Sequence, residues 1–233
     1  MTITLWRLPR LIIGIFCAFI LALSSLTIAQ ASDNNLIPKY GLQPKSESEK
    51  AADSQFIARM EKHFDGDRVK AAQAVAKRGW DFFRDGDIST AIKRFNQAWL
   101  LDPKNVQALW GMGAISSGSD LKTALSLFLE AEAIDDSDID LNVDCTRTMS
   151  LLAARDKDFA MMKDAMARFE RISRRAPLHA MNWQNWAVAL YYTGDYAGAW
   201  EKIKVVENRG ASARLDPGFI EALTQKMPRP AVQ

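Results

Sequence analysis

Apolar residues recur along this chain at intervals of three and four, which is the period of a helix that buries one face. The earliest such face carries Phe56, Ile57, Met60 and Phe64. A second helix is expected from Val69 to Phe83. No window alternates with the period of two that marks a strand, so the chain is predicted to be all-α. Short Asp/Gly or Asp/Pro breaks separate the later helices, at 85–87, 102–103, 118–120, 135–138, 156–158, 176–177 and 194–195.

The segment before the first helix has a different composition. Residues 32–45 are polar and are interrupted by Pro38, Gly41 and Pro44, which disfavour a helix. We expect a flexible strap there, without regular structure. Ser46 and Glu49 then form a capping-box pattern, which predicts that a helix begins at this point.

One arrangement of small and large residues recurs between about 71 and 210. A small residue on one helix is matched to a small-large-small face on the next helix, and a proline ends that second helix. The first unit carries Gly79-Trp-Asp-Phe82, Gly86-Asp87, Ala91, Phe95, Ala98 and Pro103. A partial second unit has Trp110, Gly113, Ala124, Phe128 and Ala131. A later unit has Trp183, Ala187, Leu190, Gly194-Asp195-Tyr196, Ala199 and Ile203.

These residues resemble the tetratricopeptide repeat (TPR) family, strongly in the first and last units. The unit between 139 and 177 keeps only the second-helix signature, Ala165 and Phe169 before Pro177, so it is irregular or extended. The resemblance implies a right-handed α-solenoid of three to four stacked helix-turn-helix units over 71–210. Residues 46–70 would form an N-terminal helical cap. Residues 211–233 would form a C-terminal capping helix and tail, with an N-cap at Asp216.

The first 31 residues have the layout of a cleavable export signal. Arg7 and Arg10 precede an apolar run over 11–23, and Ala29-Gln30-Ala31 supplies the small-x-small cleavage pattern. Cys17 lies within the apolar run and lacks the residue pattern of a lipid attachment site. We therefore expect an exported protein, periplasmic or secreted, that begins at Ser32 and has no membrane anchor after cleavage.

Loss of this leader changes the charge balance. The 30 lysines and arginines fall to 28, which equals the 28 aspartates and glutamates, so the exported chain is formally neutral. No segment concentrates lysine and arginine enough to bind phosphates strongly, which argues against nucleic acid as a partner. Cys145 becomes the only cysteine, so an intramolecular disulfide is excluded and packing must supply the stability.

Candidate catalytic chemistry is sparse. His63 and His179 lie in different units without cysteine or carboxylate at ligand spacing, and we interpret both as solvent-facing residues at helix ends. The acids of 135–140 are interpreted as caps for the following helix, with a weak cation site as the alternative. Cys145 is expected to be buried and inert, since no second cysteine accompanies it. The sequence thus predicts no cofactor, no metal and no enzyme activity.

The family resemblance implies that the first helix of each unit lines a concave surface. This geometry nominates groove residues that are aromatic, amide and cationic, which suits a protein or peptide ligand with apolar and acidic groups. For Trp80 and Trp110, a position wedged between helices remains an equal alternative. The candidates are Lys77, Trp80, Phe83, Arg84, Gln107, Trp110, Ala114, Gln184, Tyr191 and Tyr192.

Two functions follow from these observations. The first is a non-catalytic scaffold or adaptor that binds a protein or peptide through its concave surface. The alternative is a structural accessory subunit of an envelope assembly, such as secretion, pilus or cell-wall machinery. The sequence does not specify the oligomeric state or the partner's identity.

Overall fold

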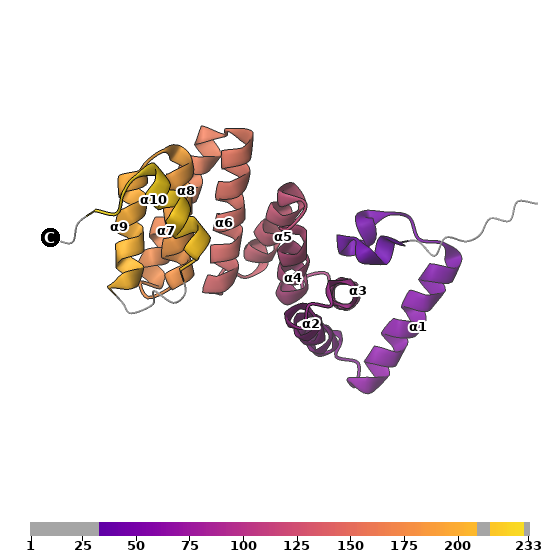
Figure 1. Cartoon of the computed structure of the whole chain (residues 1–233). Coiled ribbons are helices and arrows are strands. Elements are labelled where there is room, and N and C mark those ends of the chain that lie inside the picture. The colour runs from indigo at the N-terminus through magenta and orange to yellow at the C-terminus, as the bar shows by residue number, and fades with distance from the viewer. Residues whose placement is uncertain (1–32, 209–214, 231–233) are drawn as a thin grey trace, which may run out of the picture. The chain divides into compact units, whose positions relative to one another are not determined.

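A computed structural model describes residues 33–208 and 215–230 (Figure 1). Within these residues the chain forms α-helices and two 3-10 helices and contains no strand, so the all-α prediction is confirmed. The elements are η1 Asp33–Leu36, η2 Pro38–Leu42, α1 Glu47–His63, α2 Arg68–Arg84, α3 Ile88–Leu101, α4 Val106–Ser116, α5 Leu121–Ile134, α6 Ile139–Asp156, α7 Phe159–Arg175, α8 Ala180–Thr193, α9 Tyr196–Glu207 and α10 Pro217–Lys226. The export signal predicted at 1–31 lies outside the described residues.

The helices pack as consecutive pairs. α2 packs against α3, α4 against α5, α6 against α7 and α8 against α9 (Figure 1). Each second helix also contacts the first helix of the next pair. First helices touch one another as well, α2 with α4 and α6 with α8. Each pair therefore buries its apolar side against the next, which is the stacking expected of a repeat array.

A contact between glycine and phenylalanine holds the early pairs together. A Cβ atom added at Gly79 would lie 2.6 Å from the ring of Phe95, and one added at Gly111 would lie 2.2 Å from the same ring. Gly113 has the corresponding relation to Phe128 in the next pair, again at 2.6 Å. Phe95 is fully buried. The predicted packing of Gly79 against the second helix is confirmed, and Gly111 extends the same contact to the following pair.

The unit that lacked a first-helix signature is extended. α6 has 18 residues and α7 has 17, compared with 11 for α4 and 14 for α5. Asp138 caps α6 by accepting hydrogen bonds from the amides of Asp140 and Leu141, as expected for the acidic run. The longer helices explain why the repeat spacing fails in this region.

The N-terminal strap differs from its prediction. The expectation of no regular structure over 32–45 is wrong for 33–42, which forms η1 and η2. Lys39 and Tyr40 adopt left-handed backbone angles there. The side-chain amide of Asn96 on α3 donates hydrogen bonds to the carbonyls of Asn35 at 3.0 Å and Ile37 at 2.9 Å. Because these contacts come from residues about 60 positions away, local composition did not reveal them.

The capping box predicted at Ser46 is present. The Ser46 hydroxyl accepts from the Glu49 amide, and the Glu49 carboxylate accepts from the Ser46 amide at 2.7 Å, which completes the capping box of α1. At the other end, α10 packs on α9 and buries Leu223. The Trp200 indole donates to the carbonyl of Met227 at 3.0 Å, which fixes the end of α10. None of the described helices combines the length and apolarity needed to cross a membrane.

Candidate functional site

A cavity of about 1110 Å³ lies against the first helices of the later units. Its walls come from α4, α6 and α8, and α10 supplies part of the rim. We call it the main groove. Aromatic, amide and charged side chains line it together, including Trp110, Asp144, Arg147, His179, Gln184, Asn185, Tyr191, Tyr192 and Phe219.

A tryptophan and a carboxylate connect α4 to α6 in this groove. Trp110 Nε1 donates a hydrogen bond to Asp144 Oδ2 at 2.8 Å. Burial raises the pKa of Asp144, while the bond from Trp110 and the charge of Arg147 oppose that rise. The exposed Arg147 stands one helical turn further on, where its guanidinium is open to a ligand. This corner of the groove is therefore built from one fixed acid and one accessible cation.

His179 has a structural role at the start of α8. Its Nδ1 accepts a hydrogen bond from the amide of Asn182 at 3.1 Å, so the ring proton sits on Nε2. Nε2 lies 2.8 Å from Asp140 Oδ1 on α6. The predicted position at a helix end is confirmed, but the solvent-facing assignment is wrong, since only 20% of the side chain is exposed. His179 instead joins α8 to α6 at the edge of the groove.

Two amide side chains lie deep in the groove wall on α8. Gln184 Oε1 accepts a hydrogen bond from the amide of Asp216 at 2.7 Å, which ties α10 to α8. The neighbouring Asn185 is 95% buried, with 5% of its surface exposed, yet its side chain forms no hydrogen bond with any described residue. The amide atoms of Asn185 are not among the fully enclosed polar atoms that lack a partner, so water or a ligand in the groove can reach them. Asn185 is thus a ready-made polar contact point.

Aromatic side chains surround this amide. The ring of Tyr191 is 5.8 Å from that of Tyr192 and 5.9 Å from that of Phe219 on α10, both in edge-to-face geometry. Tyr192 is more than half exposed at the rim. These rings give the groove an apolar wall next to a polar floor, a combination common in sites that bind peptides.

A smaller cavity of about 510 Å³ continues along the first helices α2 and α4. The indoles of Trp80 and Trp110 pack edge to face at 5.2 Å, and Trp80 Nε1 donates to Gln107 Oε1 at 2.8 Å. Trp110 lines both cavities, so the two share one wall. Both alternatives for these tryptophans hold: each is wedged between helices and each lines a cavity. Lys77 and Arg84 lie at the rim.

The nominated residues can now be placed. Lys77, Trp80, Arg84 and Gln107 line the smaller cavity, Gln184, Tyr191 and Tyr192 line the main groove, and Trp110 lines both. Phe83 and Ala114 are not among the lining residues, and Phe83 packs on Trp80 at a ring distance of 5.5 Å.

Sequence reasoning missed the contribution of α6 and α10. Asp144 and Arg147 went unnoticed because the third unit has no first-helix signature, although the helical period of 139–156 would have marked the face of α6. Asn185 and Phe219 were missed because their role depends on how α10 packs over α8.

The described residues offer little for catalysis. Among them no group of three or more His, Cys, Asp or Glu side chains could hold a metal ion. Cys145 is fully buried, as predicted, and burial raises the pKa of its thiol, with the charge of Glu132 adding to that rise. A thiol of this kind is a poor nucleophile.

Comparison with known proteins supports the fold and goes no further. No family model and no curated protein matches the chain. Among solved structures, the crystal structure of MamA aligns with 74% of this chain and 99% of its own, at 16% identity and a TM-score of 0.51. The crystal structure of YrrB, described as a TPR protein with an unusual peptide-binding site, aligns with 73% of this chain and 97% of its own, at 15% identity and a TM-score of 0.31. Together with the stacked helix pairs and their repeated glycine-phenylalanine contacts, the match to MamA shows that this chain is an α-solenoid with the tetratricopeptide-repeat fold.

Proposed function

We propose that this protein is an exported, non-catalytic scaffold that binds an extended segment of a partner protein in the main groove. The observation that carries the proposal is the amide of Asn185, which has no hydrogen-bond partner among the described residues and lines a cavity of about 1110 Å³ beside aromatic side chains. A solenoid groove of this size contacts several residues of a peptide without needing a cofactor.

The chemistry of the groove suggests what the segment contains. The side-chain amide of Asn185 has two donors and an acceptor, so it can bond both the carbonyl and the amide of a peptide backbone. Tyr191, Tyr192 and Phe219 provide surfaces for apolar side chains. Arg147 can pair with a carboxylate of the ligand. The best ligand is therefore an extended peptide with apolar residues and an acidic residue.

Selection from a random peptide display library tests this proposal. Peptides that bind the wild-type protein should bind the Asn185→Ala and Tyr192→Ala variants about tenfold more weakly, because each variant removes a central contact. Titration calorimetry with an enriched peptide gives the affinities. Phe159→Ala is the matched control, since it removes an aromatic ring that is 83% exposed outside the groove, and it should bind like the wild type. Failure to enrich peptides, or equal binding by all variants, would contradict the proposal.

The location of the protein needs a separate experiment. The charged, apolar and small-residue sections of residues 1–31 support export with cleavage after Ala31. We expect the full chain, tagged at its C-terminus in a Gram-negative host, to accumulate in the periplasmic fraction with Ser32 as its first residue by mass spectrometry. A variant lacking residues 2–31 should stay in the cytoplasm. Recovery of the uncut chain from membranes would show that the leader is retained.

A further inference from the structure

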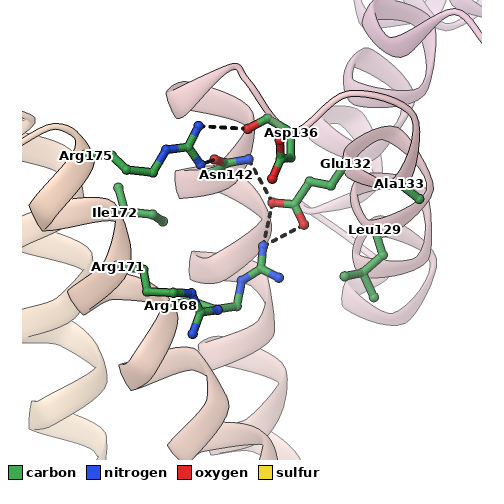
Figure 2. Close-up of a pocket in the computed structure, with 9 residues that line it drawn as sticks. All are labelled: Leu129, Glu132, Ala133, Asp136, Asn142, Arg168, Arg171, Ile172 and Arg175. Atoms are coloured by element: carbon green, nitrogen blue, oxygen red, sulfur yellow. Dashed lines mark hydrogen bonds and ion pairs between the residues drawn. The ribbon is translucent and has the colours of Figure 1, made fainter.

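A third pocket lies between α5 and α7, the second helices of their pairs, with α6 at its base (Figure 2). Its volume is about 440 Å³. Figure 2 shows Arg168 of α7 reaching Glu132 on α5 and Arg175 reaching Asn142 and Asp136, with Arg171 on the same helix between them. We call it the arginine pocket, and its main lining residues are Leu129, Glu132, Arg168, Arg171, Ile172 and Arg175.

The three arginines differ in the number of hydrogen bonds that their guanidinium groups donate within the protein. One nitrogen of Arg168 lies 2.5 and 2.6 Å from the two oxygens of Glu132, and its Nε donates to the Thr146 hydroxyl at 3.1 Å. Arg175 donates to the side chain of Asn142 at 2.9 Å and to a backbone carbonyl at 3.1 Å (Figure 2). Arg171 forms no hydrogen bond or ion pair with any described residue. The pocket thus contains one cation whose donors are all open.

The lining residues have a net charge that one negative group of a ligand would neutralise. Glu132 neutralises Arg168, and Asp136 is the only other acid among the lining residues. The three guanidinium groups therefore exceed the two carboxylates by one positive charge. Leu129 on α5 and Ile172 on α7 add apolar groups to the lining of the same pocket. A carboxylate on a short aliphatic stem matches this combination, because the planar guanidinium binds a carboxylate in a two-pronged geometry.

The neighbouring site along these helices is already occupied by the chain itself. Residues 33–42 pack on α3, where the Asn96 amide holds two of their carbonyls, and Lys39 pairs with Glu130 on α5. Glu130 lies two residues after Phe128, and Arg171 lies two residues after Phe169 in the next second helix. The two sites thus present opposite charges at the same repeat position. At the first site, Lys39 of the chain itself pairs with Glu130. At the second site, Arg171 could pair in the same way with a carboxylate from another protein.

We propose that the arginine pocket binds the carboxylate side chain of an extended segment from another protein, in the way that residues 33–42 occupy the site beside it. This site is separate from the main groove, so a partner can contact both faces of the array. A doubly charged phosphate fits less well, because Glu132 and Asp136 repel the second charge.

Titration of the purified exported chain with two capped peptides tests the pocket. One peptide has a central glutamate flanked by leucines, and the other replaces that glutamate with glutamine. We expect saturable binding of the glutamate peptide, and about tenfold weaker binding when either the peptide carboxylate or the cation of Arg171 is removed by Arg171→Gln. Shifts of amide signals from α5 and α7 in NMR spectra would locate the contact.

Arg174→Gln is the matched control. It removes the same charge from the same helix, but Arg174 pairs with Glu170 and does not line the pocket, so binding should equal that of the wild type. Free glutarate and inorganic phosphate form the remaining arms and should bind more weakly than the peptide. Equal binding by Arg171→Gln, equal binding of the glutamine peptide, no saturable binding, or tighter binding of either small anion would each overturn the proposal.

Discussion

Phe95→Ala should lower the free energy of unfolding by about 3–5 kcal/mol, the usual cost of deleting a fully buried phenylalanine ring. The ring lies where two successive helix pairs meet. It contacts Gly79 on α2 and Gly111 on α4 so closely that neither position has space for a Cβ atom. It also packs edge to face on Trp80, with ring centroids 5.3 Å apart. Removal of the ring leaves a cavity bounded by glycines, which have no side chains to fill it.

Urea denaturation followed by tryptophan fluorescence and circular dichroism measures this loss. Phe159→Ala makes the same chemical change where the ring is 83% exposed, and its denaturation midpoint should stay close to that of the wild type. Equal midpoints for Phe95→Ala and the wild type would show that the first two units are not held together through this ring.

Arg168→Gln should cost about 3 kcal/mol, because it leaves the mostly buried carboxylate of Glu132 without its cation. Only 10% of the Glu132 side chain and 20% of the Arg168 side chain are exposed. The same guanidinium also bonds the buried hydroxyl of Thr146, so the substitution breaks a link between α7 and α6 as well. Denaturation midpoints of the purified variant give the value.

Two further variants separate the effect of the unpaired Glu132 charge from the effect of the other contacts that Arg168 loses. Glu132→Gln combined with Arg168→Gln removes both charges, and we expect it to recover part of the loss, since no uncompensated charge remains. Arg174→Gln breaks an exposed pair with Glu170 on the same helix and should change stability little. A double variant as unstable as Arg168→Gln alone would mean that the lost bond to Thr146, and not the stranded carboxylate, dominates.

The helix pairs were predictable from sequence because their signals are local. Gly79, Ala91 and Phe95 have the spacing that packing requires, and Asp138 and Ser46 have the side chains that helix starts require. These features depend on residues within one or two helices. A single sequence therefore contains enough information to place them.

The groove was only partly predictable because its walls come from distant elements. Asn185 gains its role when α10 packs beside α8, an arrangement fixed by the bond between Gln184 and the amide of Asp216. The fold of 33–42 depends in the same way on Asn96, about 60 residues further on. Interactions across such separations leave no periodic pattern in the chain.

The hydrogen bonds of Trp80 and Trp110 determine what each part of the molecule can recognise. An indole has a single N–H donor, and both tryptophans use it on the next helix, at Gln107 and Asp144. A ligand near α2 and α4 therefore meets the carbon surfaces of these two rings, with the charges of Lys77 and Arg84 close by. Near α8, the side-chain amide of Asn185 is available for hydrogen bonds and can favour ligands with polar groups. Selectivity should consequently change from one end of the binding surface to the other.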